Sequence, residues 1–204
     1  MHNIWNFWAN KYDRLWVQKY SLKPTRDCIT KTLIDINNKN IKVLDLGCGP
    51  GQLISELTQK FTNIEITGID FSEKMIEISS KRNPTAKHIK MDTKELSKLD
   101  DQYDIIICTH SLPYYKHPKD VFKQLHRLLK NDGKILVGFA SGNSIYDKFI
   151  LSFVKLTTGN ANYPSDNNFR LLIHPYFSVE SLKTIKEKFF MPIIAVYTLE
   201  KVEL

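Results

Sequence analysis

The chain has 204 residues, which is long enough for one domain with a substantial buried core and too short for two ordinary ones. Its composition, 42% hydrophobic and 25% charged, excludes an intrinsically disordered chain. We therefore expect a single packed globular domain over residues 1–204.

The formal net charge is +7, from 29 Lys and Arg against 22 Asp and Glu. This excess is compatible with an anionic partner such as RNA and also with an ordinary lysine-rich surface. The lysines are spread along the chain with no run of five or more basic residues, which favours the second interpretation.

The three cysteines, Cys28, Cys48 and Cys108, form no C-x-x-C pair and indicate neither a disulfide framework nor a metal site. No window holds the roughly 18 apolar residues needed to cross a bilayer, and the first ten residues lack the pattern of a secretion signal. We therefore expect a cytoplasmic protein without a membrane span, as a monomer or a homodimer.

From residue 41 onward, short β-branched runs alternate with helical segments, which is typical of a parallel sheet in an α/β fold. Strands are predicted over residues 43–46, 64–69, 87–91, 103–109 and 135–139. Helices are predicted over residues 52–61, 72–82 and 118–129, with Ser72 as the N-cap of the second and a turn at residues 131–133 after the third.

The pattern is looser after residue 139. It predicts a helix over residues 141–159, a polar loop over 160–168, a last helix from Ser178 to about residue 190 and a terminal strand over 193–199. The chain thus divides into an N-terminal helical segment (1–40), a core (41–140), a substrate-side cover (141–177) and a last helix and strand (178–204).

A glycine loop follows the first strand in the segment Asp45-Leu46-Gly47-Cys48-Gly49-Pro50-Gly51. Glycines there let a ligand approach the main chain closely. A P-loop is excluded because Gln52-Leu53 stands where Lys and Ser or Thr are needed. The dinucleotide pattern G-x-G-x-x-G also fails, because it requires glycine at the position of Gln52.

This G-x-G-x-G loop preceded by an acidic residue resembles the first motif of class I S-adenosylmethionine (SAM)-dependent methyltransferases. It is most similar to the ubiquinone and menaquinone branch, known as methyltransferase type 11, and the resemblance covers about residues 42–139. It implies a doubly wound, mostly parallel, seven-stranded sheet of Rossmann-like type with an N-terminal helical lid. The final hairpin is either reduced or completed by a strand at residues 169–173.

The resemblance also implies which residues bind SAM, the cofactor, and its product S-adenosylhomocysteine. Asp70, at the end of the second strand, would accept hydrogen bonds from the ribose hydroxyls, and Phe71 would pack on the adenine. Asp92 would accept from the adenine amino group, or serve only as a helix N-cap, or do both. The remaining expected cofactor ligands are Tyr12, Asp45, Gly47, Cys48, Gly49, Gly51, Met75, Thr93, Thr109 and His110.

Methyl transfer from a sulfonium needs mainly an acceptor held in line, and positioning alone supplies about 7 to 11 kcal/mol. If a base is used, His110 and Tyr115 are the candidates, although His110 could equally pack against the cofactor. The candidates for the substrate pocket are Trp16, Tyr114 and His174.

Trp5, Trp8, Tyr12 and Trp16 recur at helical spacing near the start of the chain. They form either an aromatic stripe packed on the domain or a lid that closes over the cofactor and excludes water. Because no RNA-binding module is evident, we expect a small-molecule acceptor. The alternatives are an RNA methyltransferase and a SAM-binding protein without catalysis.

Overall fold

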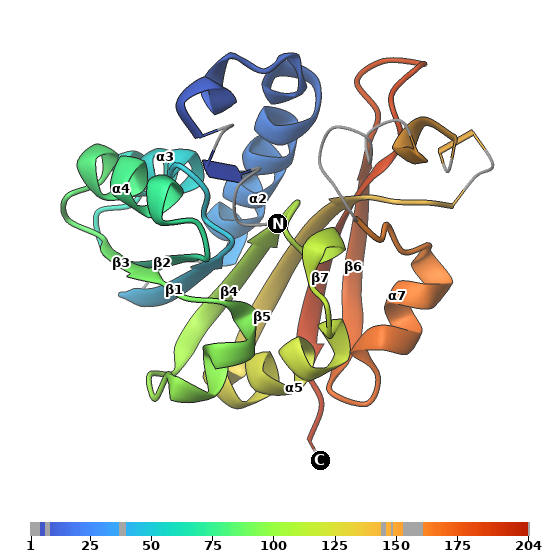
Figure 1. Cartoon of the computed structure of the whole chain (residues 1–204). Helices are drawn as coiled ribbons and strands as arrows, with labels where there is room; N and C mark the ends of the chain where they lie inside the picture. Colours follow the sequence, from blue (N-terminus) through green and yellow to red (C-terminus); the bar gives the residue numbers. More distant parts are fainter. Residues whose placement is uncertain are drawn as a thin grey trace.

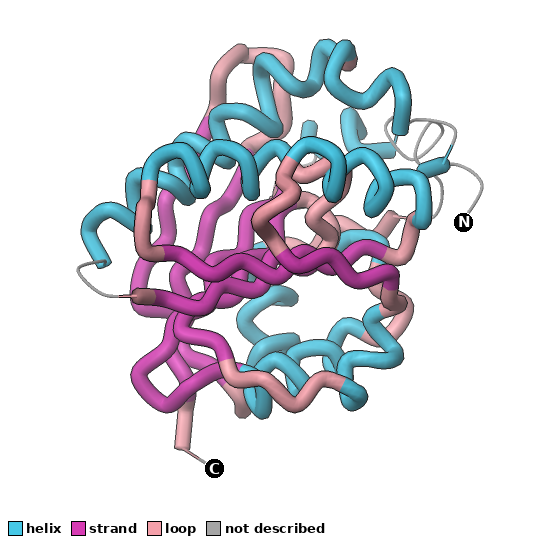
Figure 2. The backbone as a smooth tube through the Cα atoms, turned by 90° about the vertical axis from the view of Figure 1, so that its left-hand side faces the viewer, coloured by secondary structure: helices cyan, strands magenta, loops and turns pink. Residues whose placement is uncertain are grey.

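The computed structural model describes residues 5–6, 9–36, 40–143, 146–147, 149–152 and 161–203. In this part of the chain, a seven-stranded sheet runs through the middle with helices on both faces (Figures 1 and 2). Its strands are β1 (Ile41–Leu46), β2 (Ile64–Asp70), β3 (Lys87–Lys90), β4 (Tyr103–Thr109), β5 (Leu129–Ala140), β6 (Phe177–Ile185) and β7 (Ile194–Lys201). The helical elements are η1 (Ala9–Arg14), η2 (Gln18–Leu22), α2 (Lys23–Ile36), α3 (Gln52–Lys60), α4 (Glu73–Arg82), η3 (Thr93–Lys98), η4 (Leu112–Tyr114), α5 (Pro118–Leu128) and α7 (Asp166–Ile173).

The strand order is β3-β2-β1-β4-β5-β7-β6. Strands β1 to β5 pair in parallel, while β7 is antiparallel to both β5 and β6. The predicted doubly wound, mostly parallel sheet is confirmed, and its final hairpin is not reduced. The order reverses between β1 and β4, so a crevice opens at the carboxyl ends of these two strands.

The central strands are buried on both faces, as their continuous apolar runs predict. In β4, Ile105 and Ile107 pack in the core layer that contains Ile29 and Leu33 of α2. Ile106, which points to the other face, packs in the layer that contains α5 and α7. These two layers hold the sheet rigidly enough to position side chains at its edge.

The five strands and three helices predicted before residue 140 are confirmed, with small differences at their ends except in β5, which begins at Leu129 rather than at residue 135. Ser72 caps α4 as expected, because its Oγ accepts a hydrogen bond from the Met75 backbone N–H at 3.2 Å. The predicted turn at residues 131–133 lies instead inside β5, where pairing with β4 shifts from Tyr103–Leu129 to Ile105–Lys134. A bulge of this kind absorbs extra residues without ending the strand.

The prediction of a last helix from Ser178 to about residue 190 is wrong, because β6 occupies residues 177–185. Val179, Leu182 and Ile185 have helical spacing, but a register shift in β6 between Val179 and Ser181 places them along a strand. Pairing with β7 decides the outcome, because it gives the backbone groups of residues 177–185 hydrogen-bond partners on a neighbouring strand.

The strand considered for residues 169–173 is also wrong, because these residues end helix α7. Ser165 caps α7, and the four-residue spacing of Phe169 and Ile173 buries both on one helical face. The Phe169 ring lies 4.4 Å from that of Tyr197 and 5.0 Å from that of Phe139. Helix α7 therefore begins inside the predicted polar loop of residues 160–168.

The helix expected over residues 141–159 is only partly described. Residues 141–143 are not helical, residues 146–147 and 149–152 are, and residues 144–145, 148 and 153–160 lie outside the described part of the chain. No helix among the described residues combines the length and apolar character needed to span a membrane.

Candidate functional site

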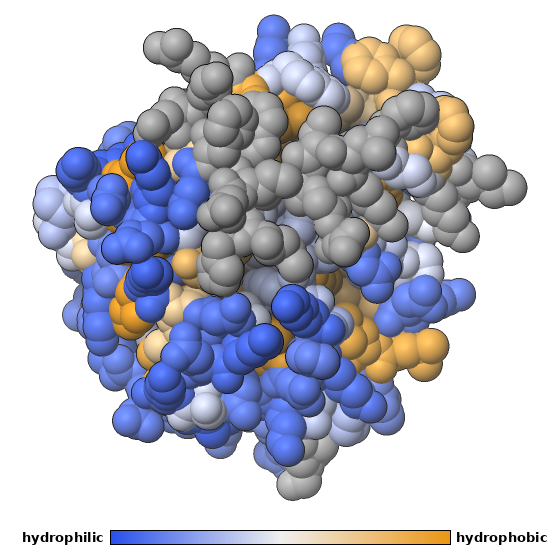
Figure 3. All heavy atoms as spheres, in the orientation of Figure 1, coloured by the Kyte–Doolittle hydropathy of each residue, from blue (hydrophilic) through white to orange (hydrophobic). Residues whose placement is uncertain are grey.

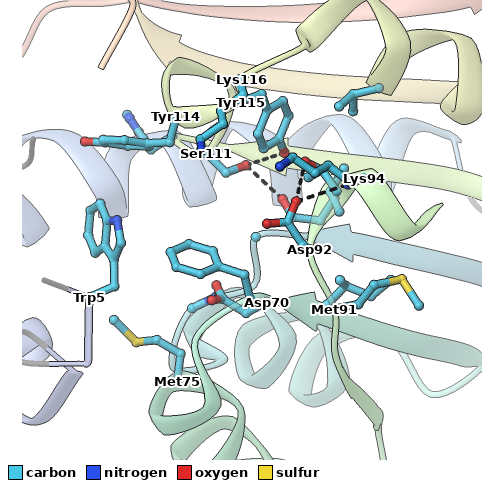
Figure 4. Close-up of a pocket in the computed structure, with 18 of the residues that line it drawn as sticks. Trp5, Asp70, Met75, Met91, Asp92, Lys94, Ser111, Tyr114, Tyr115 and Lys116 are labelled. Atoms are coloured by element: carbon cyan, nitrogen blue, oxygen red, sulfur yellow. Dashed lines mark hydrogen bonds between the residues drawn. The ribbon is translucent and has the colours of Figure 1, made fainter. Parts of the chain in front are cut away.

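A cavity of about 460 Å³ opens at the carboxyl ends of β1, β2 and β4 (Figure 4). The register brings these ends together, because Leu46 pairs with Ile69 and Asp45 pairs with Ile107. We call this the main cavity. Its wall includes twelve residues expected from the sequence: Tyr12, Gly47, Gly49, Asp70, Phe71, Met75, Asp92, Thr93, Thr109, His110, Tyr114 and Tyr115.

Asp70 stands in the middle of this wall (Figure 4). Its carboxylate accepts hydrogen bonds from the backbone N–H groups of Gly49 at 3.0 Å and Ser72 at 2.8 Å. Burial raises the pKa of Asp70 to about 6, against the opposing effect of these two donors. A carboxylate has about four lone-pair sites, so two remain for a ligand in the cavity.

The glycine loop contributes open space at Gly49 and packing at Gly51. A Cβ atom added at Gly49 would meet nothing within 4 Å, so the space beside it belongs to the cavity. One added at Gly51 would lie 2.3 Å from Ser79 Oγ and 2.4 Å from Asn83 Nδ2. Gly51 is on neither cavity wall, and its lack of a side chain lets α3 and α4 approach each other.

A second, smaller cavity of about 40 Å³ adjoins the main one, and Tyr12, Gly47, Gly49, Thr109 and His110 line both. The expected residues Asp45 and Cys48 line only this smaller cavity. Among the described residues, both carboxylate oxygens of Asp45 are buried without a hydrogen-bond partner. Burial, reinforced by the nearby Asp70 carboxylate, raises the pKa of Asp45 to about 7.

Arg26 of α2 faces Asp45 across the smaller cavity and is itself buried. Its Nε donates to Glu56 Oε1 at 2.9 Å, and its Nη1 donates to Gln18 Oε1 at 3.1 Å. Within the described part of the chain, Nη2 has no hydrogen-bond partner. The small cavity thus presents a carboxylate and a guanidinium, which is the arrangement that binds an amino-acid zwitterion.

His110 lies between the two cavities, directly after β4, with a left-handed backbone conformation (φ 55°). Its Nε2 is 2.9 Å from the Thr25 hydroxyl, which itself donates to the Ser21 carbonyl at 2.8 Å. Because the Thr25 proton is already used, Nε2–H must be the donor and Nδ1 keeps its lone pair. Burial and the charge of Arg26 lower the pKa of His110 to about 4, so the ring is neutral.

Tyr115 reaches the cavity wall, but its hydroxyl is held in a polar network. It lies 2.9 Å from Ser111 Oγ and 3.2 Å from Cys108 Sγ, and Ser111 Oγ also donates to the Leu46 carbonyl at 2.9 Å. These contacts tie the segment after β4 to the end of β1. Burial raises the pKa of Tyr115 well above its usual value, so the phenol stays protonated.

Asp92 caps η3, as one of its two expected roles requires. Its Oδ1 accepts from the Lys94 backbone N–H at 3.1 Å, and Glu95 completes a capping box. Asp92 also lines the main cavity, as do Thr93 and Phe71. The cap does not use all of the acceptor sites of the carboxylate, so both roles are compatible with this geometry.

The N-terminal segment crosses the main cavity. Trp5 packs edge-on against Tyr114, with ring centroids 5.0 Å apart, and Asn6 Oδ1 accepts a hydrogen bond from Ser72 Oγ at 2.6 Å. Tyr114 follows β4 and Ser72 follows β2, so the segment contacts the chain after two of the strands that end at the cavity. Asp13 anchors the segment further along, through an ion pair with Arg82 and a hydrogen bond from Gln52 Nε2.

Two residues expected in the substrate pocket are on neither cavity wall. Trp16 is 59% exposed, and His174 lies exposed at the end of α7. The prediction that Trp16 shares one helical face with Tyr12 is wrong. It assumed α-helical spacing, but η1 is a 3₁₀ helix and η2 is a π-helix, so that spacing does not hold across them. Trp8, also in that stripe, lies outside the described residues.

Trp5, Arg26 and Ser111 line the cavities but were not among the expected site residues. Trp5 carried a usable signal, because it belonged to the N-terminal aromatic stripe. Ser111 carried a weaker one, since it follows a buried strand at the edge where ligands bind in α/β sheets. The sequence contained no signal for Arg26, because a single basic residue within a helical segment resembles any solvent-exposed cation.

The sequence was compared with known protein families and proteins. A family model described as a methyltransferase domain matches residues 18–189. The malonyl-[acyl-carrier protein] O-methyltransferase of Priestia megaterium is 30% identical over 161 residues, which cover 76% of this chain and 56% of that protein. The demethylmenaquinone methyltransferase of Thermotoga maritima is 30% identical over 131 residues, covering 63% and 56%. The chain spans about half the length of such curated relatives.

Solved structures share the fold at lower sequence identity. The N-methyltransferase NodS of Bradyrhizobium japonicum, solved with S-adenosylhomocysteine, superimposes with a TM-score of 0.78 at 12% identity, covering 99% of this chain and 98% of that one. The magnesium protoporphyrin IX methyltransferase of Synechocystis PCC 6803, also with S-adenosylhomocysteine, gives 0.70 at 21% identity, covering 88% and 83%.

Proposed function

This chain belongs to the methyltransferase-domain family, and from that premise we propose that it transfers the methyl group of SAM to a small-molecule acceptor. One observation carries the proposal: the small cavity pairs the unpartnered Asp45 carboxylate with Arg26, directly beside Asp70. Buried charged groups without partners are costly, so a site that keeps them is built to pair them with a ligand.

The residues present fit the cofactor at each of its polar ends. Asp45 would accept the α-ammonium group of SAM, and the free Nη2 of Arg26 would donate to its α-carboxylate. Asp70 would use its two remaining acceptor sites for the ribose hydroxyls, and Gly49 leaves open space beside them. Phe71 and Asp92, which both line the main cavity, would contact the adenine ring and its amino group respectively.

The acceptor would occupy the aromatic end of the main cavity, where Trp5, Tyr12 and Tyr114 meet. The ring centroids of Trp5 and Tyr12 lie 6.4 Å apart, and Trp5 Nε1 is buried with no hydrogen-bond partner among the described residues. An enclosed aromatic wall with one free donor suits a compact, largely apolar molecule that carries a hydrogen-bond acceptor. This geometry favours a small molecule over RNA.

SAM supplies a methyl group that is already electrophilic, because it is attached to a sulfonium. The task of the protein is then to hold the acceptor in line and to keep water out. His110 contributes a neutral ring whose Nδ1 can accept a hydrogen bond from the acceptor group. With a pKa of about 4 it is a weak base, which favours positioning over proton removal as its role.

Binding of S-adenosylhomocysteine is expected to release protons near pH 7. At that pH the Asp45 carboxyl is about half protonated, because its pKa is about 7. An ammonium group beside it favours the charged form and lowers that pKa, so roughly half a proton leaves on binding. Titration calorimetry in two buffers of different ionisation enthalpy measures this release.

Asp45→Asn should abolish the proton release and weaken binding, whereas Asp120→Asn, on another part of the main cavity wall, should retain it. For the natural sequence the release should decrease as the pH rises above 7, because Asp45 is then increasingly ionised before the ligand binds. If no S-adenosylhomocysteine binds at all, the proposed function is wrong. If S-adenosylhomocysteine binds to the Asp45→Asn variant and releases the same number of protons, the assignment of Asp45 to the ammonium group is wrong.

The N-terminal segment is expected to act as a lid. Tyr12 lines the main cavity, so bound cofactor should order the segment further, and hydrogen exchange in residues 9–22 should slow on addition of S-adenosylhomocysteine. Exchange in β4 and β5 should change little and serves as the internal control. Equal protection of residues 9–22 with and without ligand would show that the segment is packed permanently on the domain.

A further inference from the structure

Four aromatic side chains form an exposed surface that the proposed methyl transfer does not use. These are Phe189 and Phe190, in the turn between β6 and β7, and Tyr146 and Phe149, in the helical residues 146–147 and 149–152. Phe189 is 85% exposed and Phe149 is 61% exposed. Single exposed apolar residues are ordinary, but a contiguous group of this size marks an interaction surface. We call these four residues the aromatic patch.

Contacts between the residues show that the patch is continuous. The rings of Phe189 and Phe190 meet edge-on, with centroids 5.4 Å apart, and the Tyr146 hydroxyl donates to the Phe190 carbonyl at 3.0 Å. Tyr146 and Phe149 are three positions apart on a helix and so share a face. Figure 3 shows apolar residues gathered at the upper right, over the turn between β6 and β7.

Lysines lie beside this patch. Lys186 and Lys188 precede the aromatic pair in the turn, and both are exposed. The Nζ atoms of Lys19 and Lys188 lie 5.3 and 5.6 Å from the ring centroid of Tyr20, which joins the turn to η2. Within the described part of the chain, none of these three lysines forms an ion pair, and Glu187 is the one acidic residue of the turn.

The patch lies at the same edge of the sheet as the candidate site. Ile194 pairs with both Ile185 and Ala140, so the turn extends beyond the carboxyl end of β5. His110 follows β4 at this edge, and Tyr20 lies five residues before Thr25, the hydrogen-bond partner of His110. A partner bound to the patch would therefore lie at the edge of the sheet that also carries the main cavity.

We propose that the aromatic patch and its lysines dock this protein on the surface of an anionic lipid bilayer. The protruding phenylalanines would enter the region between headgroups and acyl chains, and the lysines would contact the negative headgroups. Charge complementarity selects this partner, because lysines that form no ion pair with the described residues lie beside the patch, and the whole chain carries a net charge of +7. This docking does not depend on the identity of the methyl acceptor.

The test is co-sedimentation of the full chain with vesicles of phosphatidylcholine, with or without phosphatidylglycerol. The protein should sediment with the anionic vesicles and be released by salt. Phe189→Ser should weaken binding by roughly tenfold, since a large aromatic side chain no longer leaves water. Lys186→Gln combined with Lys188→Gln should weaken it by roughly tenfold or more at low salt.

Matched control variants distinguish docking through the patch from nonspecific adsorption to vesicles. Leu171→Ser removes a side chain of α7 that is 74% exposed, and Lys60→Gln with Lys81→Gln removes two cations of α3 and α4, away from the patch. Both should bind vesicles like the natural sequence, and every variant should bind S-adenosylhomocysteine equally. Equal binding to both kinds of vesicle, or equal loss in the controls, would overturn the proposal. A different result would also overturn it: light scattering shows a dimer that Phe189→Ser dissociates, and the anionic vesicles bind no protein.

Discussion

Replacing Asp70 with asparagine should weaken the binding of SAM and S-adenosylhomocysteine by roughly a hundredfold or more. A hydrogen bond to a charged group contributes about 1.5 to 3 kcal/mol, and the ribose would make two such bonds to this carboxylate. Each 1.4 kcal/mol corresponds to about a factor of ten in affinity. Asp70→Ala should cost still more, because the backbone N–H groups of Gly49 and Ser72 would also lose their acceptor.

The measurement is titration calorimetry, with circular dichroism to establish that each variant is folded. Asp104→Asn is the matched control, since Asp104 also accepts a backbone N–H, that of Lys42 at 2.8 Å, but lies at the other end of β4. It should leave the affinity unchanged. An Asp70→Asn protein that is folded and binds the cofactor normally would refute the assignment of Asp70 to the ribose.

Gly49→Val should eliminate detectable cofactor binding while the protein remains folded. The Cβ position at Gly49 meets no protein atom within 4 Å, so a branched side chain can be accommodated only by filling the cavity. The residue also has a φ of 53°, which costs an L-amino acid about 1 to 2 kcal/mol. Two further variants separate these effects.

Gly49→Ala carries the backbone strain with a smaller side chain, so it should retain more affinity than Gly49→Val. Gly51→Ala should behave in the opposite way and lower the melting temperature more than the affinity, because its Cβ would collide with Ser79 and Asn83. If Gly49→Val binds S-adenosylhomocysteine as tightly as the natural sequence, the loop has only a structural role.

The order of elements through residue 139 could be predicted because local signals and tertiary structure agree there. Apolar runs such as Ile105-Ile106-Ile107 are too short and too β-branched for helices, and a strand buried on both faces is the remaining solution. The capping role of Ser72 follows from its own side chain. Where a residue's neighbours along the chain determine its conformation, one sequence is sufficient.

The second half of the sheet could not be predicted in this way. Residues 177–185 contain apolar spacing that suits a helix, and they form a strand because β7 offers an unpaired edge. Residues 169–173 were considered for that edge, yet they form a helix whose Phe169 packs against the stacked rings of Phe139 and Tyr197. In both cases a partner distant in sequence decides between two local conformations of similar free energy.

For the candidate site, the sequence by itself determined the glycine loop and the acidic residue at the end of the second strand. Such features are recognisable because a close approach of ligand to backbone and an acceptor at a strand end each demand a particular residue type at a fixed spacing. Only the tertiary structure decided that Arg26 faces Asp45 and that Trp5, rather than Trp16, reaches the cavity. The reason is physical: Arg26 lies 19 positions from Asp45, and the position of Trp16 depends on how two irregular helical turns rotate the chain. Neither the position of Arg26 beside Asp45 nor that of Trp5 at the cavity produces a periodic pattern in the sequence. Both arise when α2 and the N-terminal segment pack against the completed sheet.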